Sequence, residues 1–163
     1  MRVRILVDDL DARAKNNGFA ALDAHPNIEV RLFNPMASRS GGLSKAAEFG
    51  TNFGRLNHRM HNKSWIADNR IALVGGRNLG DEYFDADDGI NFVDLDLLMA
   101  GPVVTQVSSN FDRFWNSPSN YPIAQLAPEA ATDAALVQLR GVLDQAAIDL
   151  RSSPYAQILR DDV

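Results

Sequence analysis

Apolar and polar residues recur along the chain in patterns that predict strands and helices in turn. Val3–Val7 alternates around Arg4 and predicts a strand, and Ile28–Phe33 predicts a second strand. Between them, Arg13–Ala24 carries apolar residues at helical spacing. A strand, a helix and a strand within about 30 residues indicate a βαβ unit, whose two strands lie parallel.

The second part of the chain predicts a hairpin, a further strand and two helices. The hairpin joins Met60–Ala67 and Ile71–Gly75 through Asp68-Asn69-Arg70. A strand over Asp94–Met99 precedes Gly101-Pro102, and proline suits the first turn of the helix that follows. The remaining predicted segments are a helix over Val103–Trp115, a polar loop over Asn116–Pro122 and a helix over Glu129–Leu150.

Length and composition then restrict the class of protein. A chain of 163 residues with 45% hydrophobic residues predicts one globular α/β domain. The sequence has no cysteine, which excludes disulfides, thiolate zinc sites and thiol nucleophiles. No apolar run approaches the ~18 residues of a membrane span, and the alternating N-terminus is too short for a signal peptide.

Charge is distributed unevenly along the chain. The net charge of -5 argues against a general nucleic-acid binder. The aperiodic stretch Asn34–Arg59 is nevertheless basic, with Glu48 as its only acid. This stretch is interpreted either as a flexible solvated loop or as a segment that meets anionic lipid headgroups, and the two interpretations are compatible. Its basic residues and histidine are Arg39, Lys45, Arg55, His58 and Arg59.

The predicted hairpin concentrates polar chemistry. His61 and Lys63 are two residues apart, so their side chains share one face of a strand. If Asn69-Arg70 forms a two-residue turn, Lys63 pairs with Gly76 and His61 pairs with Asn78. An imidazole, an ammonium and a carboxamide would then converge on one face.

These three groups suit a phosphodiester. A lysine offers a point charge to the non-bridging oxygens, an asparagine offers N–H donors, and a histidine can attack phosphorus or move a proton. Gly75 and Gly76 would leave space for a ligand beside them. The competing interpretation is a surface hairpin that happens to hold a histidine and a lysine.

The spacing of His61, Lys63, Asp68, Gly75-Gly76 and Asn78 resembles, position for position, the HKD motif of the phospholipase D superfamily. Two further segments, Gly76–Phe84 and Phe111–Ser117, are similar to the bacterial cardiolipin synthase branch. The resemblance covers residues 1–127 and implies a phospholipase D-like domain with a mixed central sheet flanked by helices, lacking its first strand and helix. Residues 128–163 are then a C-terminal helical extension or linker.

The resemblance also implies a two-step phosphatidyl transfer through a phosphohistidine. His61, Lys63 and Asn78 would be catalytic, while Gly75, Gly76 and Arg59 would bind substrate. It implies no cofactor and no metal, because lysines and asparagines neutralise the phosphate. The expected substrate is a phospholipid such as phosphatidylglycerol or phosphatidylethanolamine, and nucleic acid is not an expected partner. Asp68 is expected to support the hairpin turn.

A carboxylate should orient the histidine, and two residues compete for this role. Asp85 stands where the family's pattern has such an acid, and Glu82 is the alternative. Asp94 and Asp96 alternate on their strand, so they face either the site or solvent. The neighbouring acids, Asp81, Asp87 and Asp88, are interpreted as a solvated loop.

Metal sites are not predicted. The segment from Asp85 to Gly89 lacks the alternating oxygens and closing glutamate of a calcium loop. The pair His58 and His61 has no third ligand at a zinc-site spacing.

The sequence departs from the family pattern because it contains one HKD motif, whereas the family's active site takes two. Either the chain is one part of a longer synthase, or two copies pair their motifs in a homodimer. In both cases the isolated monomer is expected to be inactive. We expect a bacterial phosphatidyltransferase that is cytoplasmic or peripheral to the inner membrane. The alternatives are a superfamily nuclease or lipid hydrolase, and an incomplete HKD domain that serves in interaction or membrane docking.

Overall fold

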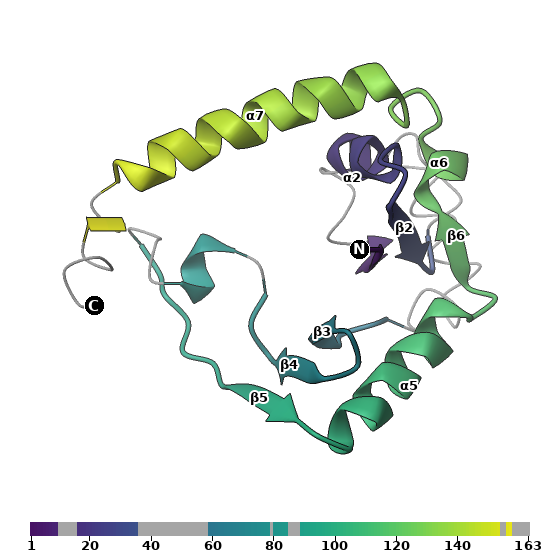
Figure 1. The fold of residues 1–163 in the computed structure, drawn as a ribbon, viewed down its shortest axis with the longest axis vertical. Helices are drawn as coiled ribbons and strands as arrows, with labels where there is room; N and C mark the ends of the chain where they lie inside the picture. Colours follow the sequence, from purple (N-terminus) through teal and green to yellow (C-terminus); the bar gives the residue numbers. More distant parts are fainter. Residues whose placement is uncertain (10–15, 36–58, 79, 85–88, 154–155, 158–163) are drawn as a thin grey trace.

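The strands in the described part of the chain form two separate three-stranded sheets with helices beside them (Figure 1). The computed structural model describes residues 1–9, 16–35, 59–78, 80–84, 89–153 and 156–157 of the chain. The predicted α/β class with flanking helices is confirmed. In the described residues the strands divide between two small sheets.

The first sheet is mixed and has the order β1-β2-β6. Strand β1 (Val3–Asp8) is parallel to β2 (Ile28–Phe33), with Val3 opposite Ile28 and Asp8 opposite Phe33. Helix α2 (Asn16–Asp23) lies between them in sequence, so the predicted βαβ unit is confirmed. The start predicted for this helix, at residue 13, lies outside the described residues.

The prediction that the whole of Asn116–Pro122 is a loop is wrong at its end. Strand β6 (Asn120–Pro122) pairs antiparallel to β2, with Phe33 opposite Asn120. The backbone N–H of Asn34 also donates to the Ser119 carbonyl at 2.8 Å. A strand this short has too few residues to show an alternating pattern, and the strand it pairs with is far away in the sequence.

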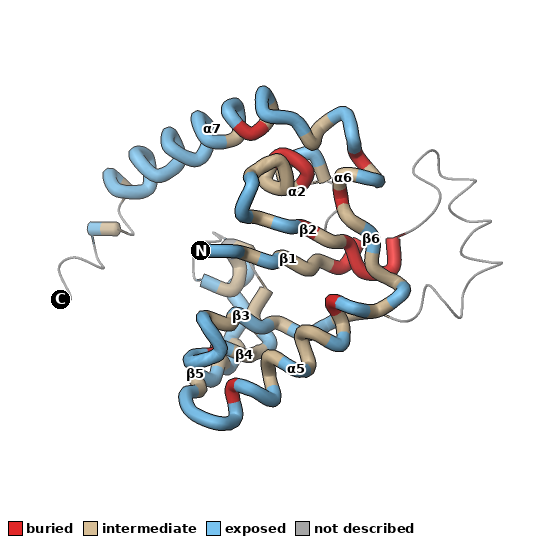
Figure 2. Tube along the Cα trace, turned by 45° about the vertical axis from the view of Figure 1, so that its right-hand side comes forward, coloured by how far each residue is buried: buried red, intermediate tan, exposed pale blue. Residues whose placement is uncertain are grey.

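The core lies between the first sheet and its helices, where Figure 2 shows the buried segments gathered. Val30 and Leu32 of β2 are fully buried, because alternate residues of a strand point to one face. They pack with Ala20 of α2 and with Ile123, the first residue of the short helix α6 (Ile123–Leu126). The Asp23 carboxylate accepts a 2.7 Å hydrogen bond from the Val30 N–H, which ties the end of α2 to β2.

Helix α7 (Asp133–Arg151) confirms the predicted C-terminal helix. Its N-cap is Thr132, whose hydroxyl accepts a hydrogen bond from the Ala135 N–H at 3.2 Å. Leu136 is buried near α2, but residues 140–152 are exposed. No helix in the described part of the chain is long and apolar enough to span a membrane. The domain boundary at residue 127 stays a prediction.

The second sheet is antiparallel and has the order β3-β4-β5. Its strands are β3 (Lys63–Ala67), β4 (Ile71–Gly75) and β5 (Asp96–Ala100). Helix α5 (Val103–Trp115) follows β5 and contacts all three strands. Ala72 of the middle strand and Val104 of α5 are both fully buried, so α5 covers the face of the sheet that carries Ala72.

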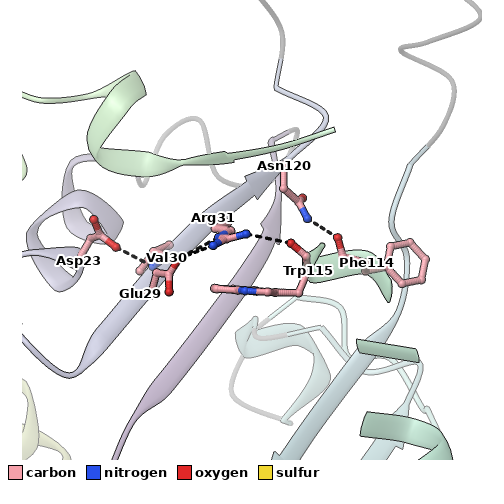
Figure 3. Close-up of polar contacts among 7 residues, drawn as sticks. All are labelled: Asp23, Glu29, Val30, Arg31, Phe114, Trp115 and Asn120. Atoms are coloured by element: carbon pink, nitrogen blue, oxygen red, sulfur yellow. Dashed lines mark hydrogen bonds and ion pairs between the residues drawn. The ribbon is translucent and has the colours of Figure 1, made fainter. Parts of the chain in front are cut away.

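The C-terminal end of α5 packs on the first sheet (Figure 3). The Phe114 ring meets Phe33 edge-on at 5.7 Å between centroids. The Arg31 guanidinium lies 4.3 Å from the centre of the Trp115 ring and donates to the Trp115 carbonyl at 3.0 Å. Arg31 also pairs with Glu29 at 2.6 Å. Helix α5 therefore contacts one sheet along its length and the other at its end.

We expect Trp115→Ala to destabilise the protein by about 3–5 kcal/mol, because it empties a nearly buried position and removes the surface on which Arg31 stacks. Urea unfolding followed by far-UV circular dichroism measures this change. Trp65→Ala is the matched control, since Trp65 is 62% exposed. Equal losses in the two variants would contradict the role given to Trp115.

Candidate active site

The β3–β4 turn holds two residues in the left-handed region. Asp68 has φ 50° and Asn69 has φ 54°, and the Arg70 N–H donates to the Ala67 carbonyl at 2.9 Å. Aspartate and asparagine tolerate this conformation better than other residues with a side chain, which explains their position here. Asp68 lies in the turn, as expected from the sequence.

The predicted hairpin register is wrong by one residue. The loop contains three residues rather than two, because Arg70 is an additional residue between the turn and the ladder, and Ala67 pairs with Ile71. Lys63 consequently lies opposite Gly75, not Gly76. The predicted pairing of His61 with Asn78 is also wrong, because both residues lie outside the paired strands.

His61 and Lys63 do come together. The Lys63 Nζ lies 3.0 Å from both ring nitrogens of His61. The imidazole is exposed just before β3 begins, and Lys63 is half-buried at the first position of the strand. The ammonium can donate to whichever ring nitrogen lacks a proton. A phosphodiester oxygen beside this pair would meet a cation and a nucleophilic nitrogen together.

Two carboxylates occupy the space beside Gly75 and Gly76. An ideal Cβ on Gly76 would lie 2.5 Å from both carboxylate oxygens of Asp94. A Cβ on Gly75 would collide with the Asp96 carboxylate and lie 2.8 Å from the Leu95 carbonyl oxygen. The space that the sequence suggested for a ligand is thus used by acidic side chains of the strand region that pairs with β4.

Arg77 is a residue that sequence reasoning missed. Its Nε donates to the Asp96 carboxylate at 2.8 Å, and its other nitrogens donate to the carbonyls of Tyr83 and Asp94 at 2.6 and 3.4 Å. The motif leaves this position unspecified, so it offered no signal. The alternation of Asp94 and Asp96 was the available hint, because it indicated a polar face that needs partners.

Asn78 is turned toward an aromatic pair in the structure. Its Nδ2 donates to the Tyr83 hydroxyl at 3.1 Å, and the Tyr83 ring lies 5.2 Å from that of Phe92. Tyr83 ends the short 3-10 helix η2 (Asp81–Tyr83). Within the described residues, no hydrogen bond joins Asn78 to His61 or Lys63.

The structure describes only one of the two carboxylates predicted to orient His61. Asp85 lies outside the described residues, as do Asp87 and Asp88. The Glu82 carboxylate lies beside Gly80, where an ideal Cβ would be 2.6 Å from Oε2. Asp94 accepts a 2.7 Å hydrogen bond from the Leu95 N–H. No group of three potential metal ligands occurs in the described part of the chain.

Arg59 has a protein partner. Its Nη1 lies 3.1 Å from the Asp8 carboxylate, and its side chain is 19% exposed. The other basic residues of its stretch, and His58, lie outside the described ranges. The substrate-binding role of Arg59 stays a prediction.

The sheet face that carries Lys63 continues into apolar side chains. Lys63, Gly75 and Asp96 form one row across the three strands, and Trp65, Leu73 and Leu98 form the next row. The side chains of the second row are 62%, 40% and 74% exposed. A charged row therefore lies directly beside an open apolar row.

Comparison with known proteins finds relatives that are named cardiolipin synthases. No protein-family model matches the chain. The chain is 46% identical over 126 residues to cardiolipin synthase C of Escherichia coli (strain K12), covering 77% of this chain and 26% of that protein. It is 31% identical over 124 residues to a cardiolipin synthase of Oceanobacillus iheyensis, covering 73% and 22%. The major cardiolipin synthase ClsA of Bacillus subtilis is 28% identical over 134 residues, covering 82% and 26%.

These relatives agree with the resemblance drawn from the motif. The chain spans about a quarter of the length of the curated relatives it matches. The similarity to proteins named cardiolipin synthase therefore concerns one part of those proteins.

The register predicts which cysteine pairs can form a disulfide, in a chain that has no cysteine of its own. Ser64 and Val74 are directly opposed, so Ser64→Cys with Val74→Cys should crosslink on mild oxidation. Ser64→Cys with Gly75→Cys should stay reduced, because those two side chains point to opposite faces. Peptide mass mapping and free-thiol titration measure both. A crosslink between positions 64 and 75, with none between 64 and 74, would instead support a two-residue turn.

We expect Gly75→Ala to cost about 1–3 kcal/mol, since the methyl group meets a backbone carbonyl as well as a carboxylate. Gly76→Ala should cost less, because the Asp94 side chain can move. Gly141→Ala is the control, since its Cβ meets open space on α7 and should stabilise by up to about 1 kcal/mol. Urea unfolding gives all three values. A neutral Gly75→Ala would disprove the close packing.

Proposed function

We propose that the chain carries one half of a phosphatidyltransferase site that acts on phospholipids through a phosphohistidine. The observation that carries this proposal is the contact between Lys63 Nζ and the His61 ring at 3.0 Å, in a motif spaced as in phospholipase D enzymes. Relatives named cardiolipin synthase support the same reaction class. These relatives are much longer proteins, so activity and substrate are proposals for this chain.

The proposed reaction has two steps. In the first, a ring nitrogen of His61 attacks phosphorus, a P–N bond forms, and the bond to the leaving alcohol breaks. A histidine of a second motif gives that alcohol its proton. In the second step the same histidine removes a proton from the incoming alcohol, whose oxygen attacks phosphorus and releases His61. Proton transfer of this kind contributes about 10²–10⁴ in rate.

Lys63 and Asn78 would stabilise the charge that develops on the phosphoryl oxygens. Lys63 already lies against the imidazole. Asn78 has one amide hydrogen engaged with Tyr83, and its amide has a second hydrogen to offer. No metal or cofactor takes part in this proposal.

The packing around the motif adds a candidate for the carboxylate that orients His61. Asp94 lies against Gly76. Gly76 directly follows Gly75, the residue that pairs with Lys63. Asp96 is occupied by Arg77, and Glu82 is placed beside Gly80. We therefore add Asp94 to Asp85 and Glu82 as the acid proposed for this role.

The open apolar row supports a phospholipid as the substrate. A phospholipid has a phosphodiester next to acyl chains, and the sheet has Lys63 next to Trp65, Leu73 and Leu98. Successive rows on one face are about 6.6–6.8 Å apart, which suits a headgroup followed by its chains. A nucleic-acid backbone would have no counterpart for the apolar row.

The second motif would come from another part of a longer chain or from a second copy in a homodimer. We propose this requirement because the sequence contains a single His-x-Lys pair. We also propose that the protein is bacterial and that it associates with a membrane surface.

The test is phosphatidyl transfer from phosphatidylglycerol or phosphatidylethanolamine, measured on each assembly separated by light scattering. His61→Gln should reduce transfer by about 10³-fold or more, because it removes the nucleophile. His25→Gln is the matched control, since the His25 Nδ1 only accepts from the Asn27 N–H in a surface turn. EDTA should leave the activity unchanged.

Transfer that persists in His61→Gln, in an assembly with no other intact motif, would overturn the mechanism. Preference for a water-soluble phosphodiester over diacyl lipids would instead overturn the substrate class.

A further inference from the structure

Three buried polar residues gather where the parallel strands of the first sheet end. Asp8 closes β1 and is 8% exposed, Asp9 follows it and is 1% exposed, and Asn34 follows β2 and is 2% exposed. In sheets with parallel strands, functional groups usually meet at the carboxyl ends of the strands. Burying a carboxylate costs free energy unless the carboxylate is paired. The partners of Asp8 therefore show which segment this end of the sheet holds in place.

Both oxygens of the Asp8 carboxylate bind the segment that leads into the HKD motif. Oδ1 accepts from the Arg59 guanidinium at 3.1 Å, and Oδ2 accepts from the Met60 backbone N–H at 3.0 Å. The side chains of Asp8 and Arg59 are only 10% and 19% exposed, so water screens this pair weakly. The partners lie 51 and 52 residues along the chain from Asp8.

We infer that Asp8 is a positioning residue for His61. The two contacts hold both residues that immediately precede the histidine, one through its side chain and one through its backbone. They therefore set the direction from which the chain enters β3 and the place from which the imidazole projects. The inference rests on the proposed function only in assigning His61 the chemical step.

Other contacts of the motif do not replace this one. Lys63 is paired to β4 through the ladder, and Arg77 is held by Asp96, but both act after the histidine in the sequence. Among the described residues, the His61 ring is hydrogen-bonded only to Lys63. Without Asp8, the exposed imidazole would be tethered from one side alone.

The experiment uses the full chain and two nuclear magnetic resonance readouts that need no activity. In the wild type, the Met60 amide should exchange its hydrogen more slowly than the exposed His61 and Asn62 amides. In Asp8→Asn, this exchange should accelerate by about tenfold or more, since the carboxamide keeps one neutral acceptor oxygen for the two donors that the carboxylate served. The ring signals of His61 should shift or broaden while those of His25 stay in place, a local signature that a general loss of stability would not produce.

Glu29→Gln is the matched control, because it removes an acid paired with Arg31 on the same sheet, away from the motif. It should leave both readouts unchanged. If Asp8→Asn does not fold, Arg59→Gln serves in its place. That variant keeps the Met60 bond and should move the His61 signals without accelerating Met60 exchange.

A Met60 amide that exchanges as fast as its exposed neighbours, or His61 signals that stay in place in Asp8→Asn or Arg59→Gln, would overturn the inference. Where an assembly has transfer activity, Asp8→Asn should lower kcat and leave KM for the lipid nearly unchanged. If wild type shows no transfer in any assembly, the proposed function fails, while the exchange and ring signals still decide the role of Asp8.

Discussion

The Arg31 guanidinium stacked on the Trp115 indole is the contact on which the arrangement of the two sheets depends. In the described residues the sheets share no strand, so something else must hold them together. Helix α5 does this, because its length packs on β3, β4 and β5 while its last turn reaches β2. Arg4 of the edge strand adds to the same cluster, lying 5.0 Å from the Phe111 ring and 2.9 Å from Asp112. The charged groups are partly exposed, so the buried indole supplies most of the stabilisation.

The hairpin that carries His61 and Lys63 is thus held on three sides. Helix α5 covers one face of its sheet, the Asp8 carboxylate holds its entry, and Arg77 with Asp96 holds its exit. The two glycines of the motif allow this arrangement, since any side chain there would displace a carboxylate. In this arrangement the His61 imidazole stays exposed. Such exposure agrees with the proposed role of His61 as a nucleophile.

Open apolar surface is the other consistent feature of the molecule. The row of Trp65, Leu73 and Leu98 and the C-terminal half of α7 both present apolar side chains to solvent. Surfaces of this kind usually bind another molecule or another part of a protein. The relatives are about four times longer than the part that this chain matches. Both observations favour the proposal that a second motif completes the site.

The sequence by itself determined the order of the longer strands and helices, but not β6 or α6, and the adjacency of His61 and Lys63, since the periods of strands and helices are local properties. It could not determine the hairpin register, because Asp68 and Asn69 both adopt positive φ and leave Arg70 as an extra residue. It also missed the pairs that hold the site and the two sheets in place. Asp8 with Arg59, Arg31 with Trp115 and Arg77 with Asp96 are separated by 51, 84 and 19 residues. Only the tertiary structure decides such contacts, because a charge has no intrinsic partner until folding brings one near and excludes water.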